Sequence, residues 1–541
     1  MGLKRCLAVL ITAVLMLNEL QTSHAEVLSS SDEAKLVGLL KNVLECRQIP
    51  GLTMTLVKGK EHRVFPLGVS NKETGDAVTP RTLFYLGTIT QAFTATLLAQ
   101  LTQRSEGSVQ FDVPITQLIG PELQLSSELL AQTVTLRDAL MHRTGLSTGS
   151  IGGMTGLPQA MSRSQVISNL KEIPMQADFR DDFRFNQFTM TLAAYVGEKV
   201  TSSTWEKLMR VHLLDKLLMT DTTVATDDRS SPDFSRSYVS VSGLLVEADP
   251  KVLDIGPLAP AATMFTNAED MVKALKFFLG DPMLLSQARM PAPLLEELMV
   301  PRILLPITYR ASVDRSSYIW PVPDISVGYG MGFFRNVYRG FQVPWAGSTT
   351  HGFSSLMWLI PERGVGVFIS INGQKHSEMP LATLQSIMYY ATDLMLGFEP
   401  WINETTACSF PEPWMKIPEF PEMDFKPEQP DFALTEYQGS FTNPLLGGLT
   451  IGKSPSNSKA LTFKMSEVTG ELLPEGGNVF RLFVDGSYKH LTTPVHGKKP
   501  IPFARLFFDF KGKQCIGLKF PDSIFGGGPV NFVKSKGKEE L

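Results

Sequence analysis

Several stretches of the chain place a hydroxyl side chain three residues before a lysine, among them Ser168–Lys171, Thr204–Lys207 and Ser535–Lys538. On a helix, positions i and i+3 lie on one face, so a lysine amine could take the hydroxyl proton and activate a nucleophile. The first stretch is not followed by an apolar helix, the second suits a surface helix, and the third lies in a charged tail. We therefore expect no covalent catalysis from these three stretches.

A fourth hydroxyl, that of Thr88, stands at the start of a long apolar segment that predicts a helix as far as Leu101. Threonine can act as a nucleophile when a base is adjacent, although its β-branched carbon stiffens the side chain. Gln91 follows one turn later and cannot be that base, because a carboxamide does not take up a proton near neutral pH. The segment therefore has the scaffold of a nucleophile without its acid–base partner.

The stretch Thr88–Gln91 resembles the Ser-x-x-Lys element of serine β-lactamases and penicillin-binding proteins. Over residues 30–398, the chain resembles the class C β-lactamases and D-alanyl peptidases, also called the S12 serine peptidases. Each further match is short, but the matches follow the order of the family along the chain. They are Val134–Leu146, Asp215–Thr222, Phe265–Met271 and Gly352–Ser355.

This resemblance implies a second motif, Tyr-x-Asn, which supplies a phenol for proton relay and an amide that contacts the substrate. Phe185 and Gln187 stand at these two positions. Glu198 sets the register, because family members usually have an acidic residue thirteen positions after the tyrosine. Phenylalanine cannot relay a proton, so this function is lost.

The family's third motif, Lys-Thr-Gly or His-x-Gly, lies on an edge strand and supplies charge or hydrogen bonding. Ala346 and Ser348 stand at its first and last positions, in a register set by Gly352. Of the six motif positions, Thr88 alone keeps the family's hydroxyl group, and the other five lose their chemical capability or change residue. General acid–base help is typically worth roughly 10²–10⁴ in rate, so we expect acyl transfer close to background.

Two histidines are candidates for a replacement base. For His142 we favour a role in the core or in helix capping, and His351 is the better candidate, with a solvated turn histidine as its alternative. The alternative function is an active serine-type hydrolase or peptidase that uses Thr88 as its nucleophile. The sequence has no metal-ligand spacing and no glycine-rich phosphate loop, so we expect no cofactor.

The pattern of apolar residues predicts an α+β fold, with an antiparallel sheet covered by helices. Because strands are predicted near both ends of this unit, we expect them to share one sheet. Short alternating strands between residues 436 and 534 predict a small all-β barrel or sandwich. Residues 437–444 resemble the opening of a lipocalin-like barrel, so we expect the barrel. The predicted helices are 26–45, 134–140, two within 192–218, 267–279 and 380–397, and the predicted strands are 51–57, 62–68, 326–336, 353–360 and 364–372.

Five segments follow along the chain. Residues 1–25 read as a signal peptide, with basic residues at its start, an apolar stretch at 6–17 and small residues before the cleavage site. That apolar stretch is too short to cross ~30 Å of hydrocarbon, so we expect cleavage and secretion rather than an anchor. Residues 26–398 form the β-lactamase-like domain, 399–432 a proline-rich linker, 433–534 the barrel and 535–541 a charged tail.

Cleavage leaves Cys46, Cys408 and Cys515, an odd number that allows one disulfide in an oxidising compartment. We expect Cys408 to pair with Cys515, which would tie the linker to the barrel; the alternative is three buried thiols. Asn403–Thr405 is an N-glycosylation sequon in the linker. The chain ends in Lys538–Leu541, which resembles an ER-retrieval tail and makes retention the alternative location.

The composition limits the partners. With 43% apolar and 19% charged residues and a formal net charge of −4, the 541-residue chain is globular and offers no electrostatic case for nucleic acid. No segment after the signal peptide is long and apolar enough to span a membrane. We interpret the chain as a secreted pseudoenzyme with an unidentified ligand in the family cleft. Its layout is similar to mollusc shell-matrix proteins of the gigasin type, which implies extracellular matrix components as partners.

Overall fold

The computed structural model describes residues 26–104, 109–147, 155–224, 233–305, 321–322, 324–375, 380–415, 425–492, 500–520 and 530–535. The predicted signal peptide and the Lys538–Leu541 tail lie outside these residues. Within them, no helix combines the length and the apolar character that crossing a membrane requires.

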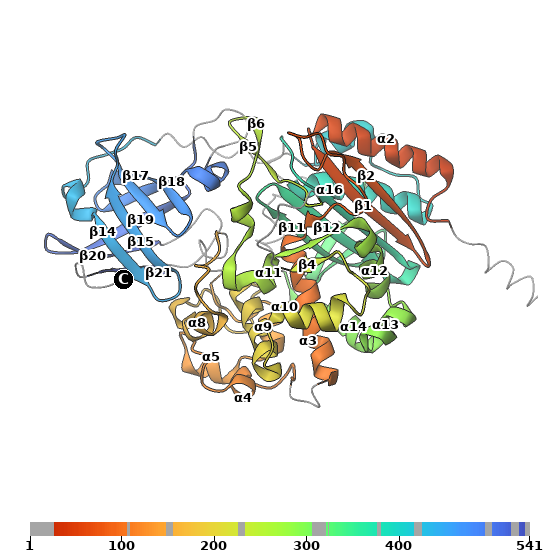
Figure 1. Ribbon diagram of the computed structural model, residues 1–541, viewed down its shortest axis with the longest axis horizontal. Helices are drawn as coiled ribbons and strands as arrows, with labels where there is room; N and C mark the ends of the chain where they lie inside the picture. Colours follow the sequence, from red (N-terminus) through yellow and green to blue (C-terminus); the bar gives the residue numbers. More distant parts are fainter. Residues whose placement is uncertain are drawn as a thin grey trace, which may run out of the picture.

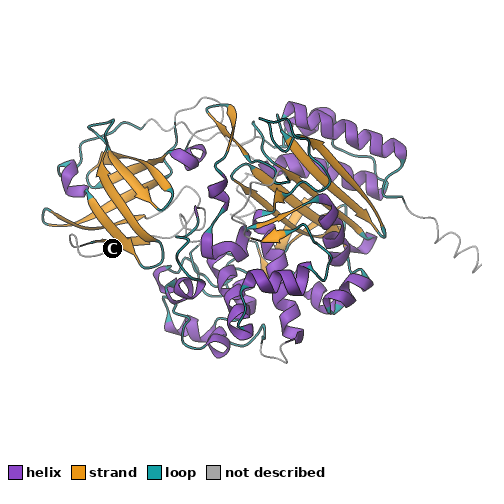
Figure 2. Cartoon of the chain, viewed as in Figure 1, coloured by secondary structure: helices purple, strands orange, loops and turns teal. Residues whose placement is uncertain are grey.

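One eight-stranded antiparallel sheet organises the larger part of the molecule, in the order β2-β1-β13-β12-β11-β10-β9-β8 (Figure 2). Strand β1 lies directly beside β13, so Leu52 pairs with Ile371. This confirms the prediction that strands from both ends of the unit share one sheet. The bounds are β1 Gly51–Lys58, β2 Glu61–Gly68, β8 Ile303–Leu304, β9 Asp324–Tyr329, β10 Phe334–Tyr338, β11 Phe341–Thr350, β12 Phe353–Ile360 and β13 Val365–Ile371.

Helices cover both faces of this sheet. Helix α2 (Ser30–Cys46) and α16 (Pro380–Leu396) pack on one face and enclose a separate apolar core with it (Figure 1). In α2 the buried residues recur at helical spacing, and the Ser29 hydroxyl accepts a hydrogen bond from Asp32 N at the first turn. On the other face, α12 (Ala268–Phe278) packs on β1, and α3 (Thr90–Arg104) is buried for nearly its whole length.

The remaining elements of this unit are short. They are β3 Phe84–Tyr85, η1 Gly87–Ile89, α4 Ile115–Ile119, α5 Glu128–Thr133, α6 Leu136–Leu140, α8 Arg163–Ser168, η2 Leu170–Glu172, α9 Gln187–Thr201, α10 Trp205–Leu208, η3 Met209–Leu214, β4 Thr223–Val224, β5 Tyr238–Val241, β6 Leu244–Glu247, η4 Pro250–Leu253, η5 Gly256–Leu258, α11 Ala259–Ala262, β7 Met264–Thr266, α13 Pro282–Ala288, α14 Ala292–Met299, η7 Pro361–Arg363 and α17 Glu404–Ser409.

Two sequence predictions for the sheet need correction. The single strand expected at residues 326–336 is two strands, β9 and β10, because the chain turns at Gly332, whose φ is +88°. The strand β11 was not predicted from its residues; Pro344 and Gly347 weaken its strand pattern. It lies inside the sheet between β10 and β12, rather than at the sheet edge.

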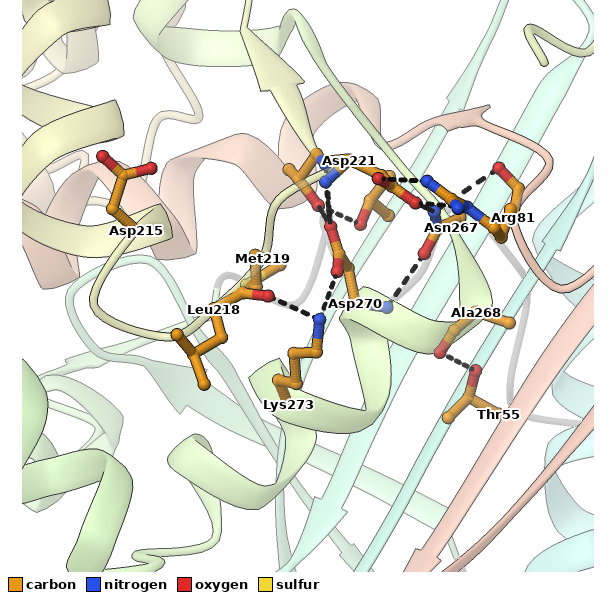
Figure 3. A network of polar contacts seen from close by, with 12 residues as sticks. Thr55, Arg81, Asp215, Leu218, Met219, Asp221, Asn267, Ala268, Asp270 and Lys273 are labelled. Atoms are coloured by element: carbon orange, nitrogen blue, oxygen red, sulfur yellow. Dashed lines mark hydrogen bonds and ion pairs between the residues drawn. The ribbon is translucent and has the colours of Figure 1, made fainter.

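Two of the short motifs hold each other in place (Figure 3). The buried carboxylate of Asp270, on α12, accepts hydrogen bonds from the backbone nitrogens of Asp221 (3.0 Å) and Thr222 (2.7 Å) and from the Thr222 hydroxyl (2.8 Å). Arg81 binds the Asp221 carboxylate with two nitrogens. The side chain of Asp215 points away from this network. These motif residues therefore fix the chain between η3 and β4 against α12 and serve the fold.

The C-terminal unit is a closed eight-stranded antiparallel barrel, in which β14 pairs with both β15 and β21. It lies beside the larger unit, on the side away from α2 (Figure 1). Tyr437, Phe480 and Phe508 pack together inside it. Its elements are η8 Leu434–Tyr437, β14 Gly439–Asn443, β15 Gly447–Lys453, β16 Leu461–Met465, β17 Val468–Gly476, β18 Val479–Val484, η9 Gly486–Leu491, β19 Ala504–Lys511, β20 Gln514–Phe520 and β21 Val530–Lys534.

The disulfide prediction was wrong. Cys408 pairs with Cys46, 362 residues away in sequence, and Cys515 is a buried free thiol. The reason is that the first part of the linker does not reach the barrel: α17 packs on α2, and Asn42 Nδ2 donates to Glu404 O at 2.8 Å. Cys515 lies on β20, inside the other unit.

The predicted glycosylation site begins the same short helix. The exposed Asn403 is the N-cap of α17, where its side-chain oxygen accepts a hydrogen bond from Thr406 N. This leaves the side-chain nitrogen, to which a glycan would be joined, on the outer side of a fixed turn. Glycosylation at Asn403 stays a prediction.

Candidate functional site: a blocked nucleophile position

Thr88 lies in the 3₁₀ turn η1, between β3 and α3, and its side chain is half-buried. Gly87 makes this turn possible, because its φ is +53°. A Cβ on Gly87 would also lie 2.0 Å from Ser348 Oγ, so the close approach of η1 to β11 requires glycine here. The turn brings residue 88 against the part of β11 that carries the third motif.

The backbone N–H and the side-chain hydroxyl of Thr88 both form hydrogen bonds with β11. The Thr88 backbone nitrogen donates to Ser348 Oγ at 3.1 Å, and the Thr88 hydroxyl donates to Gly347 O at 2.9 Å. Residues 346–350 of β11 pair with β12 only, because β10 pairs with β11 no further than Trp345. The open side of β11 therefore faces η1 and takes its hydrogen bonds.

Gln91 lies one turn further along, on α3, and is buried. Its Oε1 lies 2.9 Å from Nε2 of His142. The other ring nitrogen, Nδ1, accepts a hydrogen bond from Asn186 N at 3.1 Å, so the proton of the neutral ring is on Nε2 and points to Gln91. The position of the family's lysine is thus occupied by a glutamine, whose side-chain oxygen accepts a hydrogen bond from His142 Nε2.

His142 is completely buried, and this burial lowers its pKa to about 3. A neutral imidazole with both nitrogens engaged cannot take the proton of the Thr88 hydroxyl. The structure agrees with the interpretation of His142 as a core residue. Asp138 lies in α6, the short helix before His142. Burial opposes ionisation of the Asp138 carboxyl, but hydrogen bonds from Arg180, Thr135 and Arg143 outweigh burial and lower its pKa.

Phe185 stands against His142, with 4.7 Å between the ring centroids. Phe183 and Tyr329 also contact the imidazole, at 5.8 and 5.3 Å. This side of the site is therefore a wall of aromatic rings. The ring of Phe185 has no hydroxyl that could pass a proton to Thr88.

Two side-chain amide atoms at motif positions are buried without a hydrogen-bond partner in the part of the chain that the structure describes. Among the described residues, neither Gln91 Nε2 nor Gln187 Oε1 has a hydrogen-bond partner. An unsatisfied buried amide costs about 1–3 kcal/mol. The fold therefore keeps polar groups here at some cost in stability.

Ala346 is buried on β11, two residues before Ser348, so its methyl group occupies the place where the family has a charged or hydrogen-bonding side chain. The structure thus brings Thr88, Gln91 and Ser348 into one neighbourhood with His142, which the sequence pattern had assigned to the core. The blocking contact of Ser348 was not predicted. Its signal in the sequence is a side chain at the family's glycine position.

The other hydroxyl–lysine stretches lie elsewhere. Ser168 Oγ donates to Ser164 O within α8, and Lys171 Nζ donates to Gln124 Oε1, so these two side chains do not act together. Thr204 is the N-cap of the short helix α10, as expected for a surface helix. The structure describes only the first residue of Ser535–Lys538.

His351 is neither a solvated turn residue nor a base for Thr88. It lies in the turn between β11 and β12, is 8% exposed, and its Nδ1 lies 3.1 Å from Nε2 of His490 in the barrel. Among the described residues, no group of three or more His, Cys, Asp or Glu side chains is arranged to hold a metal ion.

Comparisons with known proteins identify the family to which this fold belongs. A family model described as Beta-lactamase matches residues 36–387, more than half of the chain. The chain belongs to the beta-lactamase family. Among curated members, "Unguisins hydrolase ungD'" of Aspergillus campestris is 23% identical over 372 residues, which are 67% of this chain and 65% of the hydrolase. Gigasin-6 of Magallana gigas is 28% identical over 236 residues, which are 43% of this chain and 77% of Gigasin-6.

Solved beta-lactamase-like structures share the fold. The octameric penicillin-binding protein homologue from Pyrococcus abyssi aligns with a TM-score of 0.54 at 17% identity, over 93% of this chain and 100% of that chain. A class C beta-lactamase aligns with a TM-score of 0.53 at 14% identity, over 67% of this chain and 96% of its own. The alignment with the Pyrococcus protein spans both the beta-lactamase-like unit and the barrel.

Proposed function

We propose that this member of the beta-lactamase family is a catalytically silent, secreted protein whose cleft and barrel serve as binding or structural surfaces in an extracellular setting. The pair of contacts between Thr88 and β11 carries the proposal. In acyl transfer, the backbone N–H of the nucleophile can stabilise the developing oxyanion, and its hydroxyl must give its proton to a base. Here Ser348 holds that N–H, and a carbonyl oxygen holds that hydroxyl proton.

The disulfide and the amide groups support the remaining parts of the proposal. The Cys46–Cys408 bond fits an oxidising compartment and therefore the predicted signal peptide. The unpartnered amide atoms of Gln91 and Gln187 fit a role in ligand binding, because polar groups of a ligand would satisfy them. The gigasin-type layout is the reason for naming an organic matrix, such as a shell matrix, as the setting.

The second candidate is an active hydrolase in which Thr88 is the nucleophile. The match to a relative whose name contains "hydrolase" favours it, as does the hydroxyl retained at position 88. For this function, η1 and β11 would have to separate and a base would have to come from outside the described site.

One experiment separates the two functions. The purified protein and a Thr88→Ala variant are incubated with a fluorophosphonate and with a penicillin probe, and adducts are read by intact-mass spectrometry, with a class C beta-lactamase treated in parallel. We expect an adduct on the class C enzyme and none on either form of this protein. A probe adduct that Thr88→Ala abolishes would establish the hydrolase instead.

A further inference from the structure

Three polar side-chain contacts between the barrel and the larger unit come from one short segment of the barrel, η9 (Gly486–Leu491), while Gly447 of the barrel also lies close to Pro158. Ser487 Oγ donates to Asp249 Oδ2 at 2.6 Å, and Tyr488 OH donates to Thr155 O at 3.2 Å. The third contact is between the ring nitrogens of His490 and His351, which are 3.1 Å apart. These contacts place η9 beside the end of β11, three residues from Ser348.

The histidine pair sets a limit on protonation. A hydrogen bond between two imidazoles needs one nitrogen with a proton and one without, so the docked pair can take up at most one additional proton. When both rings are charged, two N–H groups face each other 3.1 Å apart, and the bond becomes a repulsion between two cations. The separated rings have no such limit.

The surroundings of the pair strengthen this effect. Burial first, and then the neighbouring His351 ring, lower the pKa of His490 to about 3. The carboxylate of Asp249, next to η4, accepts a hydrogen bond from Ser487 Oγ. The other ionisable groups nearby are Tyr488 and Lys489 on η9, Lys251 on η4, Asp254 after it and Glu467 in the turn before β17.

We propose that the His351–His490 contact is an acid-sensitive latch, which holds the barrel against the β11–β12 turn at neutral pH and releases it in acidic surroundings. Release uncovers the end of β11 next to the blocked Thr88 position. The part of the molecule that moves in response to acid is the protein's own C-terminal barrel.

The direction of the pH effect follows from the protonation of His490 in the docked and released states. A released His490 takes up a proton below pH 6.5, whereas the docked ring stays neutral until the pH nears 3. The ratio of docked to released protein therefore falls as the pH falls, by about tenfold at pH 5.5 and about 100-fold at pH 4.5. Protonation of Asp249 at still lower pH removes the Ser487 contact and acts in the same direction.

The test measures hydrogen–deuterium exchange in residues 486–491 of the full-length protein at pH 7.5, 5.5 and 4.5, corrected for the pH dependence of intrinsic exchange. We expect protection to fall about tenfold and about 100-fold in the wild type, and less than about twofold in His490→Gln. His62→Gln, which changes an exposed histidine on β2, should behave as the wild type.

Circular dichroism at each pH establishes that both units stay folded, and small-angle scattering reports their separation. If His490→Gln is misfolded, His351→Gln replaces it. Equal protection of the wild type at pH 7.5 and 4.5 would overturn the latch, as would an equal loss of protection in the wild type and both latch variants.

Discussion

The hydroxyl oxygen of Ser348 lies 3.1 Å from the backbone nitrogen of Thr88 and accepts its hydrogen bond, although the two residues are 260 positions apart in sequence. A serine at this position of β11 therefore occupies the place where the oxyanion of an acyl intermediate would have to lie. The Ser348 side chain thus blocks the site, and Gln91 stands where the family has its lysine base.

Ser348→Gly tests these two causes separately. The variant frees the Thr88 N–H but returns no base, so we expect acylation by the penicillin probe to stay at background in intact-mass spectra. Protection of the Thr88 amide from hydrogen exchange should fall, because its partner is gone. Acylation of Ser348→Gly at Thr88 would mean that the Ser348 contact, and not the absence of a base, is what prevents acylation.

A rebuilt site gives the complementary result. The combined variant Thr88→Ser, Gln91→Lys, Phe185→Tyr and Ser348→Gly restores a nucleophile, a base, a phenol and a free N–H. We expect its rate of acylation to exceed that of Ser348→Gly by at least about 10²-fold, the lower range of general acid–base help. The same substitutions without Gln91→Lys are the matched control, and equal rates in the two would show that the lysine position does not matter.

His142 predicts a pH dependence of stability. Its pKa in the folded protein is about 3, against the ordinary value of 6.5, so below pH 6.5 the unfolded chain binds a proton that the folded chain does not. The free energy of unfolding therefore falls with pH in this window, by up to about 1.4 kcal/mol per pH unit.

His142→Gln should remove this contribution. Urea unfolding of the variant and its parent, both carrying His490→Gln to exclude the barrel contact, measures it between pH 7 and pH 4. We expect the variant to be less stable at pH 7 and to show a shallower fall toward pH 4. Parallel pH profiles in the two proteins would contradict the neutral, buried state of His142.

How much of this site could be predicted from the sequence depends on the range of the interactions. The motif positions 88, 91, 185 and 346 were identified because each is defined by its neighbours in the chain. The contact between residues 88 and 348 depends on how closely η1 approaches β11, which is set by packing over 260 residues. No pattern of neighbouring residues in the sequence predicts this contact.

The same distinction holds for the fold. The helix α2 and the hairpin β1–β2 were predicted because their apolar periodicity is strong and local. The strand β11 was not marked because Pro344 and Gly347 interrupt its pattern, and only its neighbours β10 and β12 make it a strand. Cysteine pairing was wrong because three cysteines allow several pairs, and packing of α17 on α2 selects one.

The Cys46–Cys408 bond should contribute to stability, because it closes a very long loop in the unfolded chain. We expect the double variant Cys46→Ser/Cys408→Ser to lose about 2–4 kcal/mol of unfolding free energy. Cys515→Ser is the control and should leave the cross-link intact. Peptide mapping without reductant should recover the linked peptides of Cys46 and Cys408, and a Cys408–Cys515 peptide would contradict the structure.

The carboxylate of Asp270 should matter more to stability than any other single group in the network of Figure 3. Asp270→Ala leaves the backbone nitrogens of Asp221 and Thr222 without their acceptor inside the protein, and the Thr222 hydroxyl keeps only its contact with Thr266. We expect a loss of about 3 kcal/mol or more, measured by urea unfolding at pH 7.5. Asp215→Ala is the matched control, since its carboxylate points away from the network and its contact with Arg210 is long, at 3.9 Å. Equal losses in the two variants would mean that the network does not hold this segment against α12.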